Sequence, residues 1–219
     1  SVMSLAGRPT PGNVRVKGGE AVGSRSGLSA NADIDRRIHG GHLAVIGAGT
    51  MGIGIAQIAA QSGHEVILYD GSEKVMQNAR HQLQTTFNKL VEKSKMTDQD
   101  AVAVMNRIYF VDHLQSFETC TLIIEAIVEN SLIKKDVYSK LEPFISNDCI
   151  LASNTSTLSI SELASACKIA SRFIGLHFFN PVPLMPLVEI IPALQTEQKH
   201  VETLQQLMES WSKWPVVAK

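Results

Sequence analysis

Short apolar runs alternate along this chain with longer segments of helical periodicity. Apolar runs at residues 43–46, 66–69 and 121–125 are short enough to be strands buried on both faces of a sheet. Between the second and third runs, apolar residues recur at three and four positions, as in an amphipathic helix: Met76, Ala79, Leu83, Phe87 and Leu90. This alternation predicts an α/β fold, in which helices cover both faces of a mostly parallel sheet.

A second helical pattern follows after residues 93–96, where the first helix is expected to fray. It begins at the polar segment 97–100 and continues through Val102, Val104, Met105 and Ile108. The two helices therefore form a hairpin inserted before the sheet resumes. The remaining predicted elements are a helix at 131–141, strands at 149–152, 173–176 and 187–191, and a last helix capped by Thr196 with the apolar stripe Val201, Leu204, Leu207, Met208 and Trp211.

A glycine-rich turn separates the first strand from a helix-like run at 53–61. Its residues are Gly47, Ala48, Gly49, Thr50, Met51 and Gly52. The second apolar run then ends on Asp70. Strand, glycine turn, helix, strand and acid in this order are typical of a dinucleotide-binding unit, although an ordinary α/β turn also produces the glycine spacing.

Each part of this motif has a physical role in nucleotide binding. Gly47 permits the tight turn, Gly49 lets a pyrophosphate approach the backbone, and Gly52 lets helix and strand pack closely. The N–H groups and the dipole of the first helical turn face the phosphates. Asp70 can accept hydrogen bonds from the adenosine ribose and would repel a 2′-phosphate, which favours NAD over NADP.

Polar residues follow three other predicted strands, where ligands bind in open parallel sheets. They are found at 125–130, at 153–156 and at His177 with Asn180 just beyond. Imidazole titrates near neutral pH, so His177 is the candidate acid and base for oxidising an alcohol; a structural histidine is the alternative. Glu189, on the next strand, can orient the imidazole, or be an ordinary surface residue.

The hydroxyl of Ser156 can donate a hydrogen bond to a substrate oxygen. Alternatively, Ser153, Ser156 and Thr157 are helix caps. The sequence contains no motif with metal-ligand spacing, so no metal is predicted.

Composition restricts the class of protein further. The formal charge of −1 over 219 residues argues against a nucleic-acid surface, and no apolar run approaches the about 18 residues of a membrane span. The three cysteines, Cys120, Cys149 and Cys167, are an odd count at irregular spacing, which suits reduced thiols and a cytoplasmic location. Residues 1–40 lack an apolar period and are interpreted as a flexible extension or an added leader; a transit peptide, and hence the mitochondrial matrix, is the alternative.

Taken together, these residues resemble the NAD-binding domain of the L-3-hydroxyacyl-CoA dehydrogenase family, which includes the 3-hydroxybutyryl-CoA dehydrogenases. The matching segments are VIGAGTMGIGIAQIAAQSGHEVILYD at 45–70, EAIVEN at 125–130, SNTSTLSI at 153–160 and GLHFFNPVPLMPLVEII at 175–191. The resemblance covers residues 41–219 and implies a Rossmann-type, doubly wound sheet.

The resemblance implies a role for each matching residue. His177 is the expected catalytic base, with Glu189 as its partner and Ser156 on the substrate oxygen. Asp70 holds the adenine ribose. The other NAD-site positions are Glu129, Lys134 and Asn180, and Thr86 and Lys93 match positions that contact coenzyme A, with Lys89 and Lys95 as competing candidates.

The activity implied by this resemblance is the interconversion of a (3S)-3-hydroxyacyl-CoA and a 3-oxoacyl-CoA with NAD, as in fatty-acid β-oxidation or butanoate metabolism. The family also has a helical second domain that carries the dimer interface, and the chain contains no counterpart of it. We therefore expect the chain alone to bind NAD, to turn over poorly and to expose Trp211 and Trp214. The alternatives are an NAD-binding module without activity and a related NAD-dependent hydroxy-acid dehydrogenase.

Overall fold

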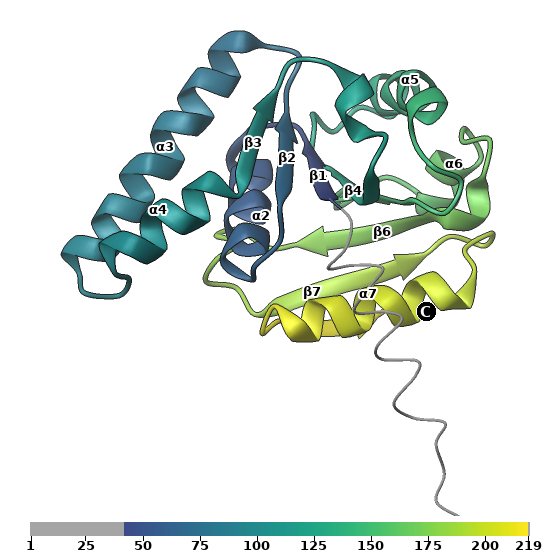
Figure 1. Cartoon of the computed structure of the whole chain (residues 1–219). Helices are drawn as coiled ribbons and strands as arrows, with labels where there is room; N and C mark the ends of the chain where they lie inside the picture. The colour runs from purple at the N-terminus through teal and green to yellow at the C-terminus, as the bar shows by residue number, and fades with distance from the viewer. Residues whose placement is uncertain (1–41, 219) are drawn as a thin grey trace, which may run out of the picture.

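A twisted, eight-stranded sheet forms the centre of the protein in the computed structural model, which describes residues 42–218 (Figure 1). The extension expected at residues 1–40 lies outside the described residues. The strands are β1 (His42–Ile46), β2 (Val66–Tyr69), β3 (Ile108–Val111), β4 (Cys120–Glu125), β5 (Ile150–Ser153), β6 (Phe173–Phe178), β7 (Leu187–Pro192) and β8 (Trp214–Val217).

The strand order is β3-β2-β1-β4-β5-β6-β7-β8. Neighbouring strands from β3 to β6 are parallel, β7 is antiparallel to β6, and β8 is parallel to β7. The predicted mostly parallel sheet is therefore confirmed, with one reversal at β7. This reversal matters for the site, because it pairs the end of β6 with the start of β7.

Helices cover both faces of the sheet. They are α2 (Thr50–Gln61), α3 (Glu73–Glu92), α4 (Asp98–Asn106), α5 (Ser131–Leu141), α6 (Ile160–Ala164) and α7 (Gln198–Ser210), with short 3₁₀ turns η1 (Leu114–Phe117), η2 (Glu142–Phe144) and η3 (Ala170–Arg172). Leu43 and Val45 of β1 pack in the core under α2, α3, α4 and α7, whereas Ala44 and Ile46 pack in the core under α5 and α6. This alternation along one strand confirms the doubly wound arrangement.

The inserted hairpin of α3 and α4 projects at one end of the sheet (Figure 1). As predicted, Thr97 begins α4, and its hydroxyl accepts a hydrogen bond from the amide of Asp100 at 3.1 Å. The prediction that Ile108 continues this helix is wrong. Arg107 ends α4, and Ile108 starts the edge strand β3, which pairs with β2.

Two predictions near the last helix are also wrong. Glu197, rather than Thr196, is the N-cap of α7, because the Thr196 hydroxyl is bonded elsewhere. It accepts from the amide of Ala193 at 2.7 Å and donates to the carbonyl of Phe173 at 2.6 Å. Trp211 is only 5% exposed and packs in the core, in contrast to the expected exposure.

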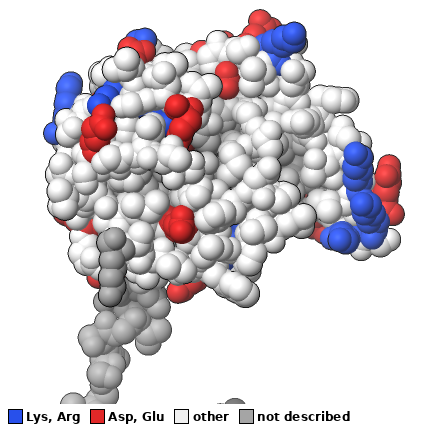
Figure 2. All heavy atoms as spheres, turned by 180° about the vertical axis from the view of Figure 1, so that it is seen from behind, with Lys and Arg blue, Asp and Glu red and all other residues white. Residues whose placement is uncertain are grey.

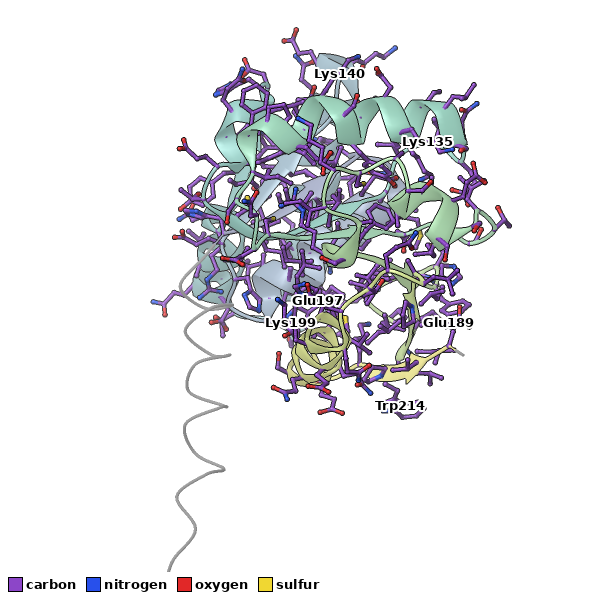
Figure 3. The ribbon with its side chains drawn as sticks, turned by 90° about the vertical axis from the view of Figure 1, so that its right-hand side faces the viewer. Lys135, Lys140, Glu189, Glu197, Lys199 and Trp214 are labelled. Atoms are coloured by element: carbon purple, nitrogen blue, oxygen red, sulfur yellow. The ribbon has the colours of Figure 1, made fainter. Side chains whose placement is uncertain are left out.

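Trp214 is 69% exposed, as expected, and Figure 3 shows it directed away from the body of the protein. It starts β8, an edge strand that was not among the predicted elements. Among the described residues, no helix has both the length and the hydropathy needed to cross a membrane.

Candidate active site

The glycine turn follows β1 at the carboxyl edge of the sheet. Gly47 has a φ of +98°, a conformation that side chains disfavour, and its amide donates to the carbonyl of Tyr69 at 2.8 Å. A Cβ on Gly52 would lie 1.7 Å from the Gly47 carbonyl oxygen, so only glycine fits there. A Cβ on Gly49 would meet nothing within 4 Å. The space required by an approaching pyrophosphate is therefore open at Gly49.

Asp70 closes the nucleotide unit at the end of β2. Its Oδ2 accepts from the amide of Ala48 at 3.0 Å, and its Oδ1 accepts from the amide of Ser72 at 2.9 Å. Each carboxylate oxygen retains a further lone pair for a ribose hydroxyl. Beside it is a cavity of about 410 Å³, whose lining includes Gly47, Gly49, Asp70, Ala126, Val128 and Ile133.

Hydrogen bonds connect the carboxyl ends of four strands into one edge. The amide of Ala126, after β4, donates to the carbonyl of Ile46 at the end of β1, at 2.7 Å. The amide of Asn154, after β5, donates to the carbonyl of Glu125 at 2.8 Å. The Asn154 side-chain oxygen in turn accepts from the amide of Phe178 in β6 at 2.8 Å. The glycine turn and the end of β6 therefore belong to one continuous site.

His177 and Glu189 form a hydrogen-bonded pair at this edge. They are direct partners in the antiparallel β6–β7 register, and the His177 Nδ1 lies 2.8 Å from Glu189 Oε2. The His177 side chain is 16% exposed and that of Glu189 is 40% exposed. With Nδ1 bonded to a carboxylate, Nε2 is the ring nitrogen left for proton exchange. The two residues are therefore brought together as the sequence predicts.

Glu129 organises the loop that carries Ser156. Its Oε1 accepts from the hydroxyls of Thr155 and Thr157 and from the amides of Ser156 and Thr157, the last two at 3.0 and 3.2 Å. Burial, the largest single influence, would raise the pKa of Glu129. These donors, together with the ammonium of Lys134, outweigh burial and leave the pKa below its ordinary value. The carboxylate is therefore held charged beneath the loop.

Lys134 lies deeper than expected for a residue lining the NAD site. It is 1% exposed, its Nζ lies 2.5 Å from Glu125 Oε1, and it lies 3.4 Å from Glu129 Oε2. Glu125, which is fully buried, also accepts from Tyr138 at 2.6 Å and from Ser153 at 2.7 Å. Glu125 was not among the predicted site residues, although a carboxylate at the end of a buried apolar strand was the available signal.

Ser156 and Asn180 are exposed at the same edge. The hydroxyl of Ser156 makes no hydrogen bond to any described residue, and Ser159 caps α6 through the amide of Glu162 at 3.3 Å. The alternative that Ser153, Ser156 and Thr157 are helix caps is therefore wrong.

Thr86 and Lys93 lie on α3 and at its end, away from the strand ends that hold the other site residues. Thr86 is half-buried, whereas Lys93 and its competitors Lys89 and Lys95 are all exposed. Figure 2 shows basic side chains gathered over the α3–α4 hairpin, with acidic ones beside them. The assignment of coenzyme A contacts to Thr86 and Lys93 stays a prediction.

Other parts of the protein offer less chemistry. A cavity of about 500 Å³ lies between the starts of β4 and β5 and the helix α7, and none of the predicted site residues lines it. Within residues 42–218, no group of three or more histidine, cysteine or acidic side chains is arranged to hold a metal ion.

Comparisons with known proteins agree with this architecture. The family described as "3-hydroxyacyl-CoA dehydrogenase, NAD binding domain" matches residues 42–219. The chain is 44% identical over 172 residues to a probable 3-hydroxybutyryl-CoA dehydrogenase of Deinococcus radiodurans, covering 78% of this chain and 62% of that protein. It is 38% identical over 205 residues to the human mitochondrial hydroxyacyl-coenzyme A dehydrogenase, covering 91% and 64%.

A solved structure of 3-hydroxybutyryl-CoA dehydrogenase from Escherichia coli K12 superimposes with a TM-score of 0.79 at 38% identity, covering 81% of this chain and 38% of that one. The (S)-3-hydroxybutyryl-CoA dehydrogenase of Ralstonia eutropha gives the same TM-score at 35% identity, covering 81% and 63%. The chain thus spans less than two thirds of the length of these relatives. By its sequence and its fold, it belongs to the NAD-binding domain family of the 3-hydroxyacyl-CoA dehydrogenases.

Proposed function

We propose that the protein interconverts (3S)-3-hydroxyacyl-CoA and 3-oxoacyl-CoA with NAD as the hydride carrier. The observation that carries the proposal is the His177–Glu189 pair at 2.8 Å, on the sheet edge that also holds the glycine turn. A dinucleotide site supplies hydride transfer, and a histidine with a carboxylate partner supplies proton transfer. Oxidising a secondary alcohol requires both.

The residues of the glycine turn fit a dinucleotide. Gly49 leaves open space and is the N-cap of α2, so the first amides of that helix are available to a phosphate, and Asp70 borders the adjoining cavity. A dinucleotide bound there would supply the hydride acceptor for C3 of the substrate. Asp70 would hold the adenine ribose, and its charge would disfavour a 2′-phosphate. Asn180, exposed after β6, and Glu129 would complete the NAD site.

His177 would take the proton of the 3-hydroxyl at Nε2 and return it in the reverse direction. Glu189, bonded to Nδ1, would fix the ring orientation and stabilise the imidazolium that forms. The Ser156 hydroxyl, which has no partner among the described residues, would donate to the substrate oxygen. Glu129 would hold the Ser156 loop in place through its bond to the Ser156 amide.

We further propose that a second, helical domain covers the exposed apolar side chains beside the site and carries a dimer interface. Four such side chains are Leu184, Met185, Trp214 and Val216, with exposed fractions of 78%, 37%, 69% and 52%. They lie on two neighbouring segments, since the amide of Trp214 donates to the carbonyl of Pro186 at 2.7 Å, and exposed apolar side chains gathered in this way mark an interaction site. Without a cover, water would reach the site, so this chain alone should bind NAD and turn over poorly.

The same proposal includes an acyl-CoA substrate, with Thr86 and Lys93 as its coenzyme A contacts. It also includes a cytoplasmic location. A mitochondrial location remains the alternative. The family signature of the segment after β6 favours an acyl-CoA over another hydroxy acid.

The test is NADH oxidation with acetoacetyl-CoA, measured on this chain alone and with the remaining segment of a longer relative supplied. We expect turnover in the second case, and a loss of about 10²–10⁴-fold in His177→Gln with NADH affinity retained. Near-normal turnover in His177→Gln would show that His177 is structural. NADH binding without turnover in the supplemented protein would favour a non-catalytic NAD-binding module instead.

A further inference from the structure

Lys213 is a buried lysine for which the proposed reaction has no evident use. It lies between α7 and β8, and the residue is 7% exposed. Its Nζ donates to the carbonyl of Val182 at 2.6 Å and to the carbonyl of Met185 at 2.8 Å. Within residues 42–218, it forms no ion pair with a carboxylate. Burial lowers the pKa of Lys213, which reflects the cost of holding a charge there.

Both carbonyls belong to the segment 179–186, which connects β6 to β7 and carries Asn180. Lys213 therefore reaches from the far end of the chain to the loop that directly follows His177. The next residue reinforces this contact, because the amide of Trp214 donates to the carbonyl of Pro186 at 2.7 Å.

The same loop is confined on its other side by α2, the helix that follows the glycine turn. A Cβ placed on Gly54 would lie 2.8 Å from the Cβ of Val182, so the loop already packs as closely as glycine allows. Val182 itself is 2% exposed. The loop is thus held between Gly54 and Lys213, and Asn180 is two residues from the point of contact.

An ammonium buried against carbonyls alone is a costly way to stabilise a fold, since a methionine of similar length would pack there without losing hydration. Unlike a methionine, the ammonium makes directional hydrogen bonds, and these fix the positions of two particular carbonyls. We propose that Lys213 is a positioning residue for the cofactor site, holding the 179–186 loop against α2 so that Asn180 faces the nucleotide. This inference rests on the proposed function and deepens it.

The experiment measures NADH affinity by calorimetry on the 219-residue chain and three variants. Lys213→Met removes the donors and keeps the length of the side chain. Gly54→Ala moves the loop from the opposite side, although alanine favours the helix itself. Lys199→Met is the matched control, because Lys199 is an exposed lysine of α7 that pairs with Glu197 at 2.6 Å (Figure 3).

We expect Lys213→Met and Gly54→Ala each to weaken NADH binding on the order of tenfold, since affinity falls with the fraction of molecules whose loop is in the binding conformation. Lys199→Met should bind as the unmodified chain does. Hydrogen exchange provides the local readout. The amides of Leu184 and Met185, which donate to the Pro181 carbonyl at 2.9 and 3.0 Å, should exchange faster in Lys213→Met while core strands stay protected.

A folded Lys213→Met that binds NADH within twofold of the unmodified chain would overturn the inference. If Lys213→Met does not fold, Lys213→Leu, which also removes the N–H donors, is measured in its place under the same criterion. The inference and the proposed function fail separately. An unmodified chain that does not bind NADH contradicts the proposed function, whereas equal binding by all four proteins contradicts only the role of Lys213.

Discussion

Replacing Gly52 with alanine tests whether the glycine turn depends on close packing. The added Cβ would lie 1.7 Å from the Gly47 carbonyl oxygen, and real Cβ atoms do not approach other atoms within 3.0 Å. The difference, 3.0 − 1.7, requires a displacement of about 1.3 Å in a densely packed region. The neighbour is backbone, tied to Tyr69 by a 2.8 Å hydrogen bond, so no flexible side chain can move aside.

The magnitude follows from two opposing effects. Overpacking of this severity costs about 3 kcal/mol, the upper end of its usual range. Alanine regains about 1 kcal/mol because it is a better helix former than glycine. The net loss of about 2 kcal/mol corresponds to a melting temperature lower by about 4–8 °C for a chain of this size.

Gly49→Ala is the matched comparison within the same turn. Its Cβ meets nothing within 4 Å, and its φ of −77° suits alanine, so the loss of stability should stay below about 1 kcal/mol, as for a changed N-cap. The methyl group would instead occupy the approach of the pyrophosphate, and NAD affinity should fall at least about tenfold.

Both variants are measured by calorimetric melting and by NAD titration. An unchanged melting temperature in Gly52→Ala would refute the packing argument. Unaltered NAD affinity in Gly49→Ala would show that the pyrophosphate does not approach the backbone at this position.

Three further predictions concern charge. Asp70→Ala should reduce the ratio of NAD affinity to NADP affinity on the order of tenfold, since a carboxylate that repels the 2′-phosphate is removed. Titrations of both cofactors measure this ratio, and equal or tighter NADP binding by the unmodified chain would contradict the prediction. Glu189→Gln should slow turnover in the supplemented protein, because the imidazolium that forms on His177 loses the carboxylate that stabilises it and orients the ring; a full rate would exclude a role for the pairing. Burial is the chief cause that lowers the pKa of His200 below 6.5, so the unfolded chain binds a proton at this histidine more readily than the folded chain. The free energy of unfolding, measured in urea, should therefore fall as the pH drops below about 6.5, and His200→Gln should reduce that fall. An identical pH dependence in His200→Gln would show that His200 does not contribute.

Elements with a strong internal pattern were predictable from the sequence. The short apolar runs form β1, β2, β4 and the rest of the parallel part of the sheet, and the segment with apolar residues three and four positions apart forms α3. The edge strands were not predictable, because an edge strand has a neighbouring strand on one side only. Its side chains are less buried, so its apolar pattern is weaker. In β3 the helical period of the preceding residues extends into Ile108, and in β8 a proline lies between the exposed Trp214 and Val216.

The candidate site shows the same division between local and long-range information. The pairing of His177 with Glu189 was predicted as a possibility, and the structure joins them through the strand register. The connections of Glu125 and Lys213 were not predicted, since their partners lie on other elements up to 31 residues away. For Glu125 the only local signal is its place at the end of a buried apolar strand, and for Lys213 nothing in the local sequence marks the charged side chain as buried.

The antiparallel register of β6 and β7 has a consequence for how this protein can change over evolution. His177 and Glu189 meet because they occupy opposite positions in one hydrogen-bonded ladder. Side chains alternate between the two faces of a strand, so one inserted or deleted residue within either strand would turn one partner to the opposite face. Point substitutions alter the pair by degrees, whereas a change of strand length abolishes it at once. Length variation among descendants of this chain should therefore accumulate outside β6 and β7.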